Sequence, residues 1–153
     1  MQLRLIAVDK LRSPHVAAIC AELRKRLAPY YAYEELEVRA GNGKNAADAM
    51  RDESERILRA LRPDDRVWLL ERTGAQLSSE ALSQRIDGVA HSGASRLTFV
   101  VAGTFGAGAA LLERVEFRWS LSELTFLHEW ARAIVLEQLY RAAKISRNEP
   151  YHH

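Results

Sequence analysis

Three short segments of the sequence combine glycines, hydroxyl groups and charges in ways that suit ligand binding. They are residues 70–74, 102–106 and 120–126. Each lies at the carboxyl end of a predicted strand. In open α/β sheets, ligands bind beyond the carboxyl ends of the strands. We therefore expect the three segments to lie at one edge of a sheet, where they could form a ligand site.

The segment 102–106, Ala-Gly-Thr-Phe-Gly, has glycines that could let the backbone approach a ligand. It does not match the three spaced glycines of the dinucleotide-binding pattern, and no Gly-Lys-Ser/Thr of a phosphate-binding loop follows. A tight turn between a strand and a helix is the alternative interpretation of the same residues.

The segment 120–126, Ser-Leu-Ser-Glu-Leu-Thr-Phe, alternates polar and apolar side chains without a clear period. A core strand would not carry so many polar groups, and a surface loop would not need Leu121, Leu124 and Phe126. A loop that encloses an amphipathic ligand such as an adenosine would use both kinds. The capped start of a helix explains the pattern equally well.

The C-terminal tail is locally basic and also carries aromatic rings. Arg141, Lys144 and Arg147 can position phosphates, and Tyr151 and His152 can stack on an unpaired base. A terminus without fixed structure is the alternative.

Four other side chains are open to more than one interpretation. Glu71, at a strand end, is either a ligand for a ribose or amine or a solvent-facing charge. We expect His128 to bond neighbouring backbone groups rather than to act in catalysis. Trp68 and Trp130 are expected in the core rather than as platforms for base stacking.

Strands and helices alternate along the chain, which predicts an α/β fold with a mainly parallel sheet and helices on both faces. Strands are expected at 3–8, 36–38, 67–71, 97–101 and 116–119. Helices are expected to begin after Ser13, Asn45 and Ser78, and a long one to span 127–144. A turn is expected at Thr73-Gly74. No linker or repeat is apparent, so we expect residues 1–153 to form a single domain.

The composition favours a globular protein in a reducing compartment. Hydrophobic residues make up 48% and charged residues 27% of the chain, and the net charge is only +2. The one cysteine, Cys20, cannot form a disulfide framework or a zinc site. No signal peptide or membrane helix is apparent. We therefore expect a cytoplasmic protein with no metal and no membrane partner.

The C-terminal third carries the most specific pattern. Residues 119–128 are Trp-Ser-Leu-Ser-Glu-Leu-Thr-Phe-Leu-His, residues 137–142 are Glu-Gln-Leu-Tyr-Arg-Ala, and residues 148–152 are Asn-Glu-Pro-Tyr-His. This pattern resembles the C-terminal signature of the RlmH family. These small SPOUT methyltransferases modify N3 of a pseudouridine in helix 69 of 23S ribosomal RNA. The resemblance extends over the whole chain, including the opening strand and the segments at 43–45, 69–74 and 77–80.

The resemblance implies a C-terminal trefoil knot, an obligate homodimer, S-adenosylmethionine as cofactor, and 23S rRNA in the ribosome as partner. It also implies an active site that borrows residues from the second subunit. Carried over position by position, the cofactor site would comprise Leu70, Ala102, Gly103, Leu121, Ser122, Glu123, Leu124, Thr125 and Phe126. The catalytic residues on the RNA side would be Arg141, Tyr151 and His152. Arg141 would stabilise negative charge on the base, and Tyr151 or His152 would orient it.

Three positions depart from the family pattern. Ala102 replaces a glycine that lines the cofactor site, Leu127 replaces a proline, and His153 replaces a terminal Arg or Lys. An alanine at position 102 is tolerated unless the φ angle of residue 102 is positive. Two other functions compete with the transferase. One is an adenosine- or nucleotide-binding α/β protein with weak or no activity, and the other is a structural factor that binds ribosomes through the basic tail.

Overall fold

The computed structural model describes residues 1–42 and 44–150. Five strands and five helices alternate along this part of the chain, and α4 is a helix that the sequence did not predict. In chain order they are β1 (Gln2–Val8), α1 (Pro14–Leu27), β2 (Tyr33–Val38), α2 (Ala46–Ala60), β3 (Arg66–Gln76), α3 (Ser79–His91), β4 (Arg96–Val101), α4 (Ala109–Arg114), β5 (Phe117–Ser120) and α5 (His128–Ser146).

The five strands form one sheet in the order β2-β1-β4-β3-β5, and every neighbouring pair is parallel. The prediction of a parallel α/β sheet is therefore confirmed. β4 lies at the centre and is buried along its whole length, as expected for a continuous apolar strand. Because all strands run the same way, their carboxyl ends meet at one edge of the sheet.

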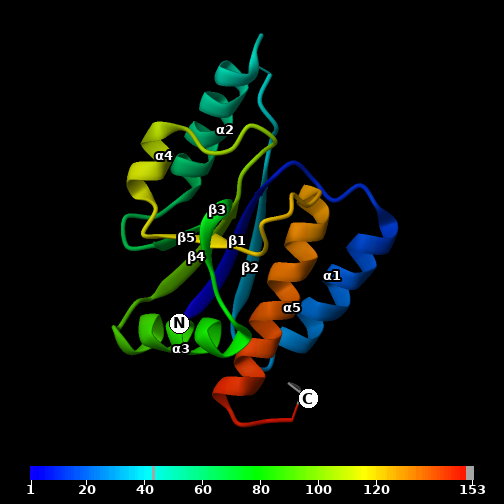
Figure 1. Ribbon diagram of the computed structural model, residues 1–153, viewed down its shortest axis with the longest axis vertical. Coiled ribbons are helices and arrows are strands. Elements are labelled where there is room, and N and C mark those ends of the chain that lie inside the picture. The colour runs from blue at the N-terminus through cyan, green and yellow to red at the C-terminus, as the bar shows by residue number, and fades with distance from the viewer. Residues whose placement is uncertain (43, 151–153) are drawn as a thin grey trace.

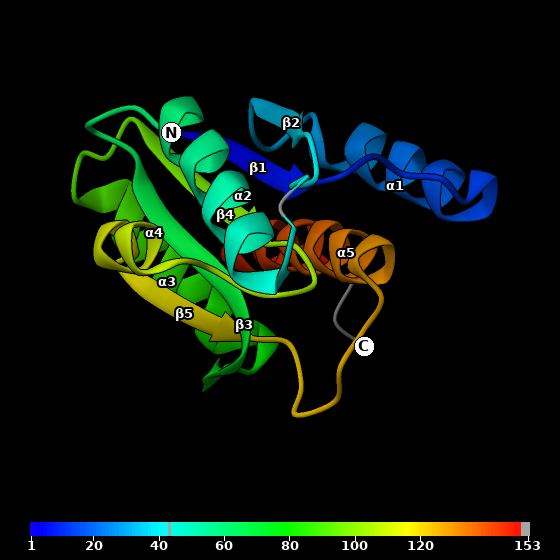
Figure 2. The same cartoon turned by 90° about the horizontal axis from the view of Figure 1, so that it is seen from above.

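Helices cover both faces of the sheet, as predicted (Figure 1). Alternate residues of the strands point to opposite faces and build two cores. Leu5, Trp68 and Phe99 pack with α1, α3 and α5 on one face. Ile6 and Leu69 pack with α2 and α4 on the other. Figure 2 shows α2 and α4 lying together on their side of the sheet.

The helix starts follow from local capping chemistry. The side-chain oxygens of Ser13, Asn45 and Ser78 each accept a hydrogen bond from the backbone N–H three residues later, which stabilises the first turn. Pro14 stands at the first position of α1, where its missing N–H is not needed. These three predicted helix starts are confirmed.

Two expectations from the sequence need correction. Thr73-Gly74 does not end the strand, because β3 continues to Gln76, although Leu70 and Ala75 both pair with Trp119 of β5 and the residues between them form an irregularity. Trp68 is buried as expected, but Trp130 is 47% exposed and does not belong to the core of this chain. In the described part of the chain, no helix has the length and apolar character needed to cross a membrane.

Candidate functional site

A cavity of about 330 Å³ opens at the carboxyl ends of β4 and β5, beside the irregular middle part of β3. The three segments singled out in the sequence all contribute to its lining. β3 contributes residues 70–72, the loop after β4 contributes residues 102–104 and 106, and the segment between β5 and α5 supplies most of the rest. This last segment leaves the end of the sheet and reaches the start of α5 (Figure 2). The sheet therefore brings the three segments together, as expected.

The segment after β5 is tied to β3 by hydrogen bonds. The Ser120 hydroxyl oxygen lies 2.9 Å from the carbonyl oxygens of both Arg72 and Ser122. The backbone N–H of Leu124 donates to the Ser122 hydroxyl at 3.1 Å. Gly74 permits the close approach of β3 and β5, because a Cβ there would lie 2.6 Å from the Arg118 carbonyl oxygen. These contacts fix one wall of the cavity.

A buried acid of α2 packs beneath the loop after β4. Glu53 is 5% exposed, and its Oε1 accepts a hydrogen bond from the Gly41 N–H at 2.9 Å. A Cβ at Gly103 would lie 2.1 Å from Glu53 Oε2, so only glycine fits at position 103 without movement. The turn closes with a hydrogen bond from the Gly106 N–H to the Gly103 carbonyl at 3.0 Å, with Gly106 at a φ of 81°.

The departure at Ala102 causes no backbone strain. In the described part of the chain, the non-glycine residues with positive φ are Asp9 and Asn148. Ala102 therefore has an ordinary φ, and its methyl group is tolerated. The departure at Leu127 leaves an exposed side chain at the N-cap of α5, without a side-chain capping bond.

His128 lies at the first position of α5 and faces the loop after β4. Its Nε2 is 3.3 Å from the hydroxyl oxygen of Thr104, and both residues line the cavity. His128 therefore bonds a side chain across the cavity wall, whereas the sequence suggested a bond to neighbouring backbone. This contact joins the start of α5 to the end of β4.

Eight of the nine residues assigned to the cofactor by resemblance line this one cavity. They are Leu70, Ala102, Gly103, Leu121, Ser122, Leu124, Thr125 and Phe126. Glu123 is exposed and lies outside the lining.

Among the residues assigned to catalysis, the structure describes Arg141 alone. Arg141 is on α5, where its guanidinium pairs with Glu137 at 2.7 Å, and it does not line the cavity. It lies roughly 20 Å along the helix axis from His128, at 1.5 Å per residue. Tyr151, His152 and His153 fall outside the described residues.

Some residues at the site were not singled out individually. Arg72 and Thr104 lie in segments that were expected at the site, and they line the cavity together with Trp119. Glu53 lies beneath it, and here the sequence held a usable signal. Glu53 precedes Ile57 by four positions, so it shares the apolar face of α2. A carboxylate on such a face indicates a buried polar contact.

The cavity suits a ligand with both apolar and polar parts. Its size falls within the range of small-molecule sites. Leucine and phenylalanine side chains supply apolar surface, while Ser122, Thr125 and the backbone around Gly103 supply polar groups. Glu71 Oε2 is buried and makes no hydrogen bond with a described residue, although it lies 3.6 Å from Arg118 Nη1. It is an acceptor that a ligand hydroxyl or amine can satisfy. The described residues contain no group of three or more acids, histidines or cysteines placed to hold a metal.

Comparison with known proteins agrees with this geometry. A family model described as "Predicted SPOUT methyltransferase" matches residues 1–152. Proteins named Ribosomal RNA large subunit methyltransferase H align over almost their full length. That of Rubrobacter xylanophilus is 40% identical, covering 97% of this chain and 96% of the relative. That of Gloeobacter violaceus is 38% identical, and the alignment covers 100% of this chain and 99% of the relative. That of Desulfitobacterium hafniense strain Y51 is 36% identical, covering 99% of each. The chain therefore belongs to the SPOUT methyltransferase family.

Proposed function

We propose that the protein transfers a methyl group from S-adenosylmethionine to N3 of a pseudouridine in helix 69 of 23S ribosomal RNA, acting on the ribosome in the cytoplasm. One observation carries the proposal. The segments that carry the family signature, in the middle part of β3 and at the ends of β4 and β5, line a single amphipathic cavity. The names of the full-length relatives support a substrate in the large ribosomal subunit.

The cavity residues fit the cofactor by their chemistry. Leu70, Leu121 and Phe126 offer apolar surface to an adenine ring, and the backbone beside Gly103 offers hydrogen-bonding groups. The buried Glu71 Oε2 offers an acceptor for a ribose hydroxyl or the amino group. When bound there, the cofactor supplies an electrophilic methyl group.

The RNA-side residues act on the ring nitrogen. N3 of a uracil-type ring holds its proton at neutral pH, so that proton must leave, to His152 as a general base or to water, and the anion that remains needs stabilisation. Arg141 stabilises the negative charge that develops on the ring, and Tyr151 or His152 orients the base. Most of the rate enhancement comes from holding the ring in line with the methyl group.

The distance between Arg141 and the cavity supports a homodimer. Roughly 20 Å of α5 separates Arg141 from His128 at the cavity wall, so one chain does not bring both to one substrate atom. A second copy supplies Arg141 together with Tyr151 and His152. Three large apolar residues near the start of α5 are exposed and form the surface for that copy: Leu124 at 70%, Leu127 at 72% and Trp130 at 47%. We further infer that the C-terminal half of the single domain is threaded as a trefoil knot.

Two measurements test the proposed function. Calorimetry with S-adenosylmethionine is expected to show binding, and undermethylated ribosomes are expected to accept a labelled methyl group. Cofactor binding without transfer would indicate a nucleotide-binding protein that lacks activity. Ribosome binding without methylation, in the presence of cofactor, would indicate a structural factor instead.

A further inference from the structure

A second cavity, of about 270 Å³, lies at the carboxyl end of β1. β1 is the sheet neighbour of β4, so this cavity adjoins the one described above. His128 lines both and forms a shared wall. The other residues that line the second cavity come from the end of β1, the following loop and the start of α5: Val8, Asp9, Lys10, Arg12, Leu127, Glu129 and Arg132.

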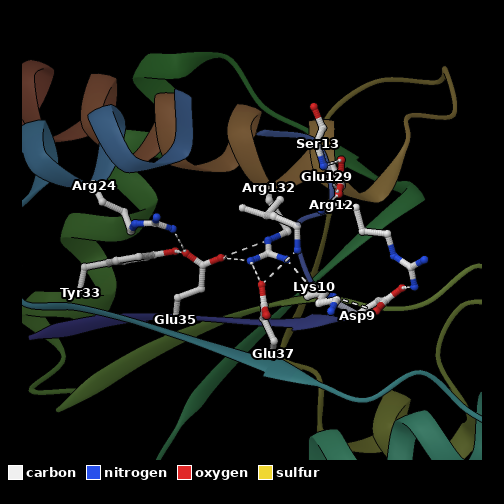
Figure 3. A network of polar contacts seen from close by, with 11 residues as sticks. Asp9, Lys10, Arg12, Ser13, Arg24, Tyr33, Glu35, Glu37, Glu129 and Arg132 are labelled. Carbon is white, nitrogen blue, oxygen red and sulfur yellow. Dashed lines mark hydrogen bonds and ion pairs between the residues drawn. The ribbon is translucent and has the colours of Figure 1, made fainter. Parts of the chain in front are cut away.

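The loop that carries Lys10 and Arg12 has a fixed conformation. Asp9 adopts a φ of 67°, and its N–H donates to the Val38 carbonyl at 2.8 Å. The Asp9 carboxylate accepts from the Lys10 N–H and from Arg12 Nη2, both at 2.9 Å. Arg132 Nη1 donates to the Asp9 carbonyl at 3.3 Å (Figure 3). The loop is therefore ordered before any ligand binds.

The start of α5 connects this loop to the first cavity. The carboxylate of Glu129 accepts hydrogen bonds from the backbone N–H groups of Arg12 and Ser13, the latter at 3.2 Å (Figure 3). Glu129 lies three residues after Phe126, the last residue of the segment that lines the first cavity. The position of Lys10 and Arg12 relative to that cavity is thus set by direct bonds.

The carboxylates around the second cavity are already engaged, whereas two cations face solvent. Glu129 is held by backbone N–H groups, and Arg132 is enclosed by Glu35 and Glu37. Lys10 is exposed and makes no ion pair with a described residue. The Arg12 side chain is 72% exposed, and its pair with Asp9 is a surface pair of little strength. An external anion can bind both cations without leaving a buried charge unpaired.

The positive charge continues to the next strand end. β2 lies beside β1, and the segment after it carries exposed Arg39 and Lys44. Cations at successive strand ends, leading away from a cavity, match the repeated phosphates of a nucleic acid backbone better than one small anion.

We propose that Lys10 and Arg12 bind a phosphodiester of the RNA strand next to the nucleotide that is methylated. This inference rests on the proposed function, because it names a contact made by the same RNA. The contact is electrostatic, so it holds the strand in place and takes no part in methyl transfer.

The test uses Lys10→Ala, Arg12→Ala and the double variant in the full-length protein. The measurements are kcat and KM for undermethylated ribosomes at several salt concentrations, together with calorimetry of S-adenosylmethionine binding. The double variant is expected to raise KM about tenfold or more and to reduce the slope of log KM against log salt by about 1 to 2. The kcat and the cofactor Kd are expected to stay within about twofold of wild type, and Lys10→Arg to keep the wild-type KM.

The matched controls lie at the opposite end of the sheet, where the strands begin. Lys25 is exposed near the end of α1, and Arg59 is an exposed arginine paired with Glu55 near the end of α2. Lys25→Ala and Arg59→Ala are expected to leave KM and its salt slope unchanged.

Two results would overturn the inference. One is a double variant with the wild-type KM and salt slope. The other is a raised cofactor Kd with an unchanged KM for ribosomes, which would assign the two cations to the cofactor. Failure of the proposed function looks different, because the wild-type protein itself would then transfer no methyl group. In that case, filter binding of the variants to ribosomes still tests the phosphate contact.

Discussion

The buried carboxylate of Glu53 decides which residue can occupy position 103. The side chain crosses from α2 to the underside of the loop after β4 and leaves no room for a Cβ at Gly103. Because that loop forms a wall of the proposed cofactor site, one contact beneath the site controls its shape. The carboxylate also holds the Gly41 N–H, so two loops depend on it.

Replacing Gly103 by alanine is expected to weaken cofactor binding by about tenfold or more, or about 1.4 kcal/mol. The added methyl group would overlap the Glu53 carboxylate, whose Oε2 lies 2.1 Å from the ideal Cβ, so the Glu53 side chain or the loop that lines the cavity must shift. Calorimetry with S-adenosylmethionine measures the change. Gly88→Ala is the control, because no atom lies within 4 Å of its Cβ. Wild-type affinity in Gly103→Ala would contradict this account of the loop.

Cys20 is expected to resist thiol reagents in the folded protein. It is 0% exposed in α1, and burial raises the pKa of its thiol, an effect to which the nearby Glu35 carboxylate adds. The reactive thiolate is therefore scarce and shielded at neutral pH. Ellman's reagent should detect no thiol in the native state and one after unfolding in guanidinium chloride. Rapid labelling of the native protein would show that α1 does not pack as described.

At the scale of elements, a buried ion-pair cluster fastens α5 to the edge of the sheet. Arg132 of α5 is 2% exposed, and its guanidinium binds Glu35 and Glu37 of β2 (Figure 3). Although burial acts to lower the pKa of Arg132, the hydrogen bonds to Glu37 and Glu35 raise it, so Arg132 stays charged. Arg24 of α1 joins the same cluster through Glu35 at 2.7 Å. Three elements thus meet at one charge cluster.

Arg132→Met is expected to destabilise the protein by about 2 kcal/mol, because it removes the buried cation that pairs with Glu35 and Glu37 and leaves Arg24 as the partner of Glu35. Urea unfolding followed by circular dichroism measures the loss. Arg51→Met is the control, since the Arg51 side chain is 65% exposed in its pair with Asp48. That change should cost less than about 1 kcal/mol. Equal losses in the two variants would mean that the cluster adds no stability.

The elements that the sequence predicted correctly are those with local causes. Ser13, Asn45 and Ser78 cap helices through bonds that span only three residues. α4 was missed because its six residues are too few to show a helical period. The continuation of β3 past Thr73-Gly74 depends on pairing with β5, a contact between distant parts of the chain. Such pairing is not visible in a local pattern.

At the scale of the whole molecule, the family signature predicted which residues line the cavity. It did not predict how far Arg141 lies from them. The lining residues were predicted as a group, whereas the separation of Arg141 from them depends on the direction of α5. Trp130 was expected in the core because its apolar surface suggests burial, but no element of this chain covers it. The homodimer proposed above would explain both findings.

A mixture of two variants tests whether the active site spans two subunits, at a cofactor concentration low enough to leave the weakened site of Gly103→Ala largely empty. Arg141→Ala keeps its cavity, and Gly103→Ala keeps its Arg141. In a mixed dimer, one site combines the intact cavity of one subunit with Arg141 of the other. Equal mixing is expected to restore about a quarter of the wild-type activity, because half of the dimers carry one working site of two. A mixture that stays inactive, while sedimentation shows exchange of subunits, would place the site within one chain.

The most direct test of the account is mass mapping of helix 69. Undermethylated ribosomes are incubated with the protein and S-adenosylmethionine, and fragments of 23S ribosomal RNA are then analysed by mass spectrometry. We expect one added methyl group on a pseudouridine of helix 69, and none with Arg141→Ala or without the cofactor. An unmodified helix 69 after incubation with protein that binds the cofactor, or a methyl group elsewhere in the RNA, would contradict the proposed function.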